Sequence, residues 1–120
     1  MKYRLLPLLI VLLLLLAASC SGPERMLIGK WSLAGRMIGG APSSFWFKRN
    51  GVVLAPWEKR SYAMLSEGTY EFTDDTHIRI VIDQGHYKGN VYQFQIIKLT
   101  ENELVLGSDF EEIRLKRVSD

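Results

Sequence analysis

Residues 70–82 read YEFTDDTHIRIVI, and this stretch decides the fold class of the chain. Aromatic residues alternate with polar ones as far as Asp74 and Asp75, and isoleucines occupy every second position from Ile78. Successive side chains of a β-strand point to opposite faces, so this period of two predicts strands with one buried face. The two aspartates favour a turn, which predicts a hairpin between antiparallel strands.

Strands of the same kind follow one another along the chain. Asn50-Gly51 separates two apolar segments, and this dipeptide is typical of tight hairpin turns. Beyond Phe94 the apolar face switches to Ile97 and Leu99, which predicts a β-bulge near residue 96. Eight predicted strands lie around residues 27–33, 45–47, 52–55, 70–72, 78–82, 92–99, 104–106 and 113–115. The less regular segment 56–67 could hold a further short strand at 61–65.

The side chains on the inward face of these strands are bulky, and we expect them to fill the interior. They are Trp31, Phe45, Phe47, Tyr70, Phe72, Ile78, Ile80, Ile82, Tyr92, Phe94, Ile96, Leu104, Leu106, Ile113 and Leu115. About eight short antiparallel strands, with no helix in the mature part, predict an all-β fold. A small closed up-and-down barrel is favoured over a sandwich, because closure removes the exposed strand edges.

The N-terminus has the organisation of a secretory signal peptide. A basic start precedes an apolar run over residues 5–18, which as a helix rises about 21 Å, short of the roughly 30 Å hydrocarbon core of a bilayer. Residues 16–20 read LAASC and resemble the lipobox of bacterial lipoproteins, in which a diacylglycerol is attached to the cysteine. We expect a signal peptide over residues 1–19 and a lipid on Cys20. The alternative is an ordinary secretory signal followed by an unrelated cysteine.

We expect residues 20–26 to be the lipidated cysteine and a short tether, followed by one barrel domain over residues 27–120. An extended tether over residues 21–25 reaches at most about 20 Å, which keeps the domain near the bilayer. Ser21 stands where an Asp signals inner-membrane retention, so the resemblance implies an outer-membrane anchor facing the periplasm. Lipidation also uses the single cysteine of the chain and leaves no thiol for other chemistry.

The charge of the mature domain is balanced. The chain has 15 Lys and Arg residues, and removal of Lys2 and Arg4 with the signal leaves 13, equal to the 13 Asp and Glu residues. No basic block or stripe is visible along the mature sequence, so nucleic-acid binding has no electrostatic support.

Several short motifs resemble a known family. Gly29-Lys30-Trp31 resembles the G-x-W signature of the lipocalin-like superfamily, and residues 47–53 (FKRNGVV) resemble a hairpin of small bacterial lipocalin-like lipoproteins. Residues 68–70 and 99–106 resemble later strands of the same proteins, so the likeness covers roughly residues 27–117. Residues 29–35 are also similar to the start of META-type periplasmic domains, although the C-N pair of that family is missing.

The lipocalin-like resemblance implies structural roles for two residues. In lipocalins the signature Trp closes one barrel end and an Arg from the last strand packs across it. The resemblance assigns these roles to Trp31 and Arg117. Arg117 follows Ile113 and Leu115 at every second position, so it is expected on the same face of the strand. The alternative is that Trp31 is any buried aromatic and Arg117 a solvated terminal charge.

No catalytic or metal-binding constellation stands out, and we expect no enzyme activity, metal or cofactor. Asp74, Asp75, His77 and Asp83 are explained as turn and strand-end residues, because their spacing matches no known metal loop. His77 is expected to face solvent. Glu111 and Glu112 are neighbours on a strand, so they point to opposite faces and cannot act as an acid/base pair.

Two functions remain open from the sequence. The first is a lipid-anchored interaction or scaffolding module with an envelope partner, using Trp46 and Trp57 as exposed anchors. The second is binding of a small apolar ligand at a barrel mouth lined by Trp57, Tyr62 and Met64, although these residues could instead cover the barrel end.

Overall fold

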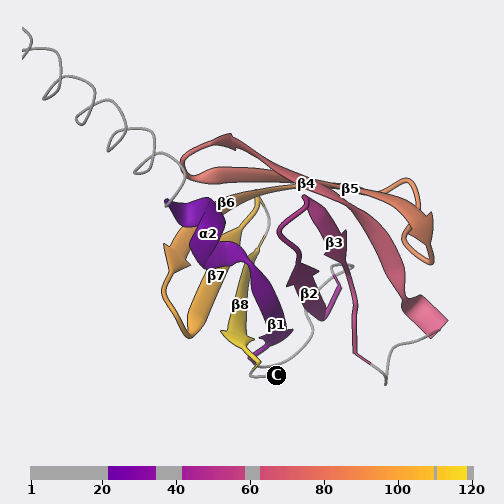
Figure 1. Ribbon diagram of the computed structural model, residues 1–120, viewed down its shortest axis with the longest axis horizontal. Coiled ribbons are helices and arrows are strands. Elements are labelled where there is room, and N and C mark those ends of the chain that lie inside the picture. The colour runs from indigo at the N-terminus through magenta and orange to yellow at the C-terminus, as the bar shows by residue number, and fades with distance from the viewer. Residues whose placement is uncertain (1–21, 35–41, 59–62, 110, 119–120) are drawn as a thin grey trace, which may run out of the picture.

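A computed structural model describes residues 22–34, 42–58, 63–109 and 111–118. Their eight strands form a closed antiparallel barrel in which each strand pairs with the next and β8 returns to β1 (Figure 1). The strands are β1 Gly29–Leu33, β2 Ser44–Phe47, β3 Val52–Leu54, β4 Ser66–Asp74, β5 His77–Gly85, β6 Val91–Leu99, β7 Glu103–Gly107 and β8 Glu112–Arg117. The prediction of an eight-stranded up-and-down barrel is therefore confirmed.

The barrel interior is packed with the side chains that the alternation assigned to it. Every predicted inward residue is buried or packs against the buried cluster, which also includes Leu27, Val53 and Ala55. Aromatic rings run through the centre: Phe45 stacks on Phe47 with centroids 5.7 Å apart and meets Phe94 edge-on at 6.3 Å. Such contacts hold the rings in fixed positions and fill the interior with apolar surface.

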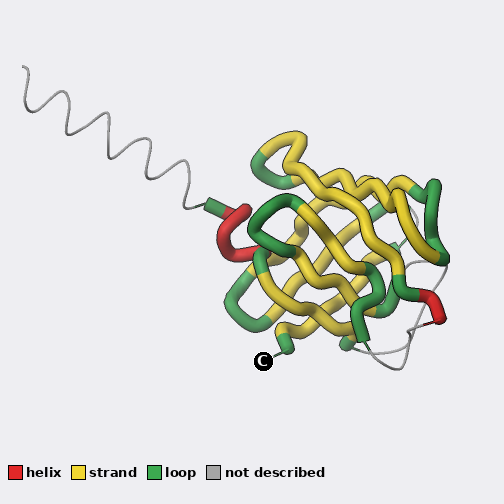
Figure 2. Tube along the Cα trace, turned by 45° about the vertical axis from the view of Figure 1, so that its right-hand side comes forward, coloured by secondary structure: helices red, strands yellow, loops and turns green. Residues whose placement is uncertain are grey.

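The expectation of no helix in the mature part is wrong, because Pro23–Leu27 forms the short helix α2. Proline at the first helical position favours a helix start, and Leu27 is fully buried against the barrel. Figure 2 places α2 at one end of the barrel and a helical turn at Ala63 and Met64 at the other. Most of the predicted tether is thus helical and docked on the barrel, which shortens its reach.

The β-bulge predicted near residue 96 is present, but the residue it turns outward is not the one expected from the sequence. The pairing of β6 with β7 shifts between Ile96 and Lys98, so Ile97 is the extra residue. Leu99 packs against the core, as the predicted switch of the apolar face requires, whereas Ile97, which was predicted to share that face, is 49% exposed. Its side chain lies over Gly107, where an added Cβ would collide with it.

Two strand predictions are corrected in the segment between β3 and β4. The strand after the Asn50-Gly51 turn ends at Leu54 and excludes Ala55. In the predicted strand at 61–65, Ala63 to Leu65 are not in a strand, and Ser61 and Tyr62 lie outside the described residues. The longer connection carries Pro56, whose missing N–H cannot join a strand ladder.

Candidate functional site

The first and last strands of the barrel meet in a contact between two side chains. Trp31 is completely buried, and the guanidinium carbon of Arg117 lies 4.2 Å from the centroid of its ring. The backbones of these two residues are paired across β1 and β8. A cation over an indole is stabilising by about 0.5–2 kcal/mol. The structure thus brings Trp31 and Arg117 together where the barrel closes on itself.

The same two side chains hold α2 on the barrel. Trp31 Nε1 donates to the carbonyl of Leu27 at 2.9 Å, and Arg117 donates to the carbonyls of Ile28 at 2.8 Å and Met26 at 2.6 Å. Arg117 also donates through Nε to the carbonyl of Glu101 in the β6–β7 turn. A helix leaves its last carbonyls without partners inside the helix, and here side chains supply them. The position of α2 is therefore fixed by the barrel.

A second cluster lies on the outer surface of β1 and β2 and consists of Lys30, Trp46, Lys48 and Trp57, which we call the Trp–Lys face. The Lys30 Nζ atom is 4.5 Å from the ring centroid of Trp46 and 5.2 Å from that of Trp57. The Lys48 Nζ atom is 4.5 Å from the ring centroid of Trp46. All four residues are half-buried, so each keeps part of its surface accessible to solvent.

Hydrogen bonds fix Trp57 on this face. Its indole Nε1 donates to the carbonyl of Trp31 at 3.2 Å, and its backbone N donates to Oγ of Ser44 at 3.1 Å. Beside it, Oγ of Ser32 donates to Glu58 at 2.5 Å.

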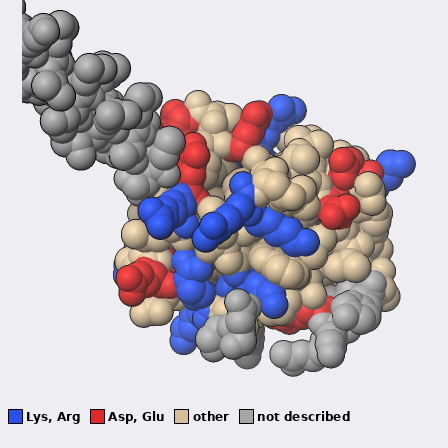
Figure 3. Space-filling model, viewed as in Figure 1, with Lys and Arg blue, Asp and Glu red and all other residues tan. Residues whose placement is uncertain are grey.

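Figure 3 shows Lys and Arg side chains gathered on the side of the barrel where α2, β1 and β8 are seen in Figure 1, with acidic groups towards the margins.

The residues predicted to line a barrel mouth have different neighbours. Trp57 contacts β1 and β2, as described above, whereas the sulfur of Met64 accepts a hydrogen bond from the hydroxyl of Tyr87 at 3.7 Å. Met64 is 42% exposed. Tyr62, the third residue of the predicted site, lies outside the described residues. Ligand binding by Trp57, Tyr62 and Met64 stays a prediction.

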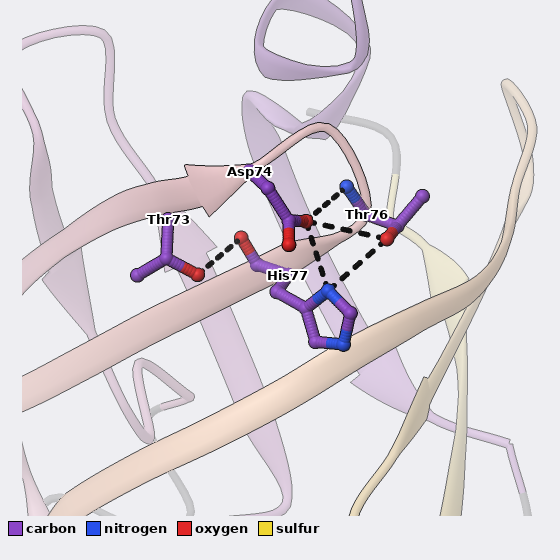
Figure 4. A network of polar contacts seen from close by, with 4 residues as sticks. All are labelled: Thr73, Asp74, Thr76 and His77. Atoms are coloured by element: carbon purple, nitrogen blue, oxygen red, sulfur yellow. Dashed lines mark hydrogen bonds and ion pairs between the residues drawn. The ribbon is translucent and has the colours of Figure 1, made fainter.

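A polar network occupies the turn between β4 and β5 (Figure 4). Asp74 Oδ1 accepts from the backbone N of Thr76 at 2.9 Å and lies 2.8 Å from Nδ1 of His77. The hydrogen bond from Thr76, followed by that from His77, lowers the pKa of the exposed Asp74 carboxyl. His77 is exposed, as its parity predicted. The network organises the hairpin turn.

This turn also forms one wall of a surface groove of about 840 Å³. Gln93, Gln95 and Ile97 of β6 line it, together with residues 107–109 and 111–112 near the β7–β8 turn. Among the described residues, no group of three or more His, Cys, Asp or Glu side chains is placed to hold a metal ion. Within the same residues, no helix is long and apolar enough to cross a membrane.

Comparisons with known proteins identify the architecture. A lipocalin-like protein from Bacteroides uniformis superposes with a TM-score of 0.59 at 16% sequence identity, covering 78% of this chain and 99% of the other. The fold is lipocalin-like. An uncharacterized protein from Bacteroides eggerthii shares it, with a TM-score of 0.56, 18% identity, and coverage of 76% of this chain and 98% of the other.

The likeness to these lipocalin-like structures extends to the fold alone, because sequence identity is low. No family model matches the sequence, and no curated protein matches it significantly. The alternation of residues on this lipocalin-like barrel did identify Trp46 as outward-facing, but it missed the two lysines that contact it. Lys48 could have been found, since it shares parity with Trp46. Lys30 reaches Trp46 only through the pairing of β1 with β2.

Proposed function

We propose that this chain is a lipid-anchored lipoprotein of the bacterial envelope whose barrel has a non-enzymatic interaction or scaffolding role. The signal-like residues 1–19 and the lipobox-like stretch ending in Cys20 support the anchor. By the same resemblance, the anchor lies in the outer membrane and faces the periplasm. The docked helix α2 supports the interaction role, because a barrel held this close to its anchor works at the membrane surface.

The observation that carries the interaction role is the Trp–Lys face. Trp46 and Trp57 belong to the residue type most enriched in binding hot spots, and both remain partly accessible on the barrel exterior. By contrast, the interior is occupied by stacked aromatic rings. The exterior therefore offers this barrel more opportunity for recognition than the interior does.

The environment of the reactive side chains favours a non-enzymatic role. His77 is engaged with Asp74 in an exposed turn, and the hydroxyl of Ser44 accepts from the backbone of Trp57. Catalysis needs a nucleophile or base aligned with a partner beside a substrate cavity. His77 and Asp74 also border the surface groove of about 840 Å³, where they organise the β4–β5 turn, and Ser44 holds the loop of Trp57; we assign them these structural roles.

The anchor is tested by mass spectrometry of the N-terminal peptide of the protein isolated from cell membranes. The proposal predicts a peptide that begins at Cys20 and carries acyl chains, and it predicts that Cys20→Ser abolishes both processing and membrane association. An unmodified Cys20 in the membrane-isolated protein would refute the anchor.

The interaction role is tested by photo-crosslinking in cells, with a photoreactive residue in place of Trp46. Val91 provides the matched control position, since it lies on the outward side of β6 and is 47% exposed. A discrete adduct from position 46, to a protein or to a lipid, and none from position 91 is expected. Equal labelling from both positions would argue against a specific surface at the Trp–Lys face.

A further inference from the structure

We propose that the Trp–Lys face lies against the anionic surface of the bilayer that anchors the chain. This inference rests on the proposed function, since it needs a lipid on Cys20. It adds the identity of the partner, which is the headgroup region of a membrane, and the orientation of the barrel, which lies with β1 and β2 towards the bilayer.

The first argument is the position of the face relative to the anchor. The described chain begins at Gly22, two residues after Cys20, and two extended residues span about 7 Å. Trp31 and Arg117 fix α2 on the barrel, so α2 cannot swing away to lengthen this connection. Lys30 follows the last residue of α2 by three positions, and β1 continues directly from the helix (Figure 1). Only α2 and a few flanking residues therefore separate Lys30, the first residue of the Trp–Lys face, from the cysteine that would carry the acyl chains.

The second argument is the chemistry of the face. Indole rings have an apolar body and a polar N–H, and tryptophan is enriched at both interfaces of membranes. Lysines are attracted to anionic lipid headgroups and increase binding by about fivefold each. The Nζ atom of Lys30 lies within 5.2 Å of both indole ring centroids, and that of Lys48 lies 4.5 Å from the centroid of Trp46. The aromatic rings and the positive charges therefore lie on the same part of the surface.

The charges of the adjoining segments make the attraction modest. Arg25 on α2 and Arg49 in the β2–β3 turn are exposed and add positive charge. Glu24 and Glu58 offset part of it, and Glu58 accepts a hydrogen bond from Ser32. The tether compensates for this weakness. A short linker gives a neighbouring site an effective concentration of about millimolar, so a face too weak to recruit a free protein can still orient an anchored one.

Lipid-dependent quenching of tryptophan fluorescence tests the inference. The acylated mature protein, beginning at Cys20, is reconstituted into phosphatidylcholine vesicles with or without phosphatidylglycerol, using lipids brominated in the acyl chain near the headgroup. Trp31 is fully buried and provides an unquenched background. Quenching is expected to be greater with phosphatidylglycerol, and the double variant Trp46→Phe, Trp57→Phe is expected to lose it.

Two matched charge variants make the test specific to this face. Lys30→Gln combined with Lys48→Gln is expected to lower the equilibrium constant for docking by roughly 25-fold, from about fivefold for each lysine, and the quenching is expected to fall with it. Lys88→Gln combined with Lys98→Gln makes the same change of charge at exposed positions elsewhere on the barrel, and it is expected to keep the quenching of the unsubstituted protein. Circular dichroism establishes that each variant is folded.

The outcomes separate this inference from the proposed function. Two results would overturn the docked orientation and leave the lipid anchor intact. One is an acylated, vesicle-bound protein whose tryptophan fluorescence is not quenched, and the other is an equal loss of quenching in the two double lysine variants. A photo-crosslink from position 46 to a protein in place of lipid would also overturn it. A preparation without acylation at Cys20 would overturn the proposed anchor, and the inference with it.

Discussion

Replacement of Arg117 by alanine tests how the barrel end and α2 are held together. The side chain donates to the carbonyls of Met26, Ile28 and Glu101 and covers the ring of Trp31. Hydrogen bonds from a charged donor contribute about 1.5–3 kcal/mol each, and the cation–π contact contributes about 0.5–2 kcal/mol. Arg117 is half-exposed and its contacts are not additive, so we expect a loss of about 3 kcal/mol in the free energy of unfolding.

The expected loss lowers the melting temperature by about 10–20 °C in a domain of this size. Circular dichroism measures it, and limited trypsin digestion adds a local measurement, because cleavage after Arg25 requires α2 to unfold. Arg117→Ala should speed this cleavage under conditions in which the barrel remains folded.

Arg114→Ala is the matched control for this experiment. Arg114 lies on the same strand, and its ion pair with Glu112 at 3.7 Å joins two largely exposed side chains. Exposed ion pairs contribute about 0–1 kcal/mol, so a change below about 8 °C in melting temperature is expected. If Arg117→Ala and Arg114→Ala gave equal melting temperatures and equal cleavage after Arg25, the proposed attachment of α2 through Arg117 would be refuted.

Three further predictions concern the core, the pH dependence and the interior. Trp31→Ala is expected to lower the free energy of unfolding by about 3–5 kcal/mol in urea titrations, as for other large-to-small core changes. An unchanged urea midpoint would show that Trp31 does not stabilise the core. Burial, with a smaller contribution from Glu24, raises the pKa of Tyr70, whose hydroxyl donates to the carbonyl of Lys48 at 2.6 Å. Folding therefore favours the neutral phenol. Its contribution to the free energy of unfolding is complete below the unfolded pKa near 10 and is lost as pH rises through the folded pKa. Tyr70→Phe should reduce this loss of stability at alkaline pH, as measured by the melting temperature at a series of pH values. Native mass spectrometry followed by solvent extraction should find no stoichiometric ligand, because aromatic rings occupy the interior, and a recovered apolar molecule would favour the ligand-binding alternative at Trp57, Tyr62 and Met64.

The sequence by itself determined the barrel and its core. The period of two assigned Phe45, Ile80 and Leu115 to the interior, and all are buried, because side-chain direction in a strand follows from local backbone geometry. The bulge near Ile96 was predictable for the same reason, as a break in the alternation. Its outward residue was not predictable, because the partner strand β7 decides which residue is left unpaired.

Only the tertiary structure decided where α2 lies, and which side chains form the Trp31–Arg117 contact and the Trp–Lys face. A helix of five residues is too short to be stable alone, so Pro23 at its start is a weak local signal and tertiary contacts decide whether the helix forms. Its partner Arg117 lies 91 positions from Met26. The Trp–Lys face depends in the same way on strand register, which places Lys30 opposite Trp46. Alternation along a strand determines the side of the sheet on which a residue lies, whereas the pairing of strands in the closed barrel determines which residues lie beside it. The candidate sites of this protein consist of residues from different strands, so they depend on that pairing.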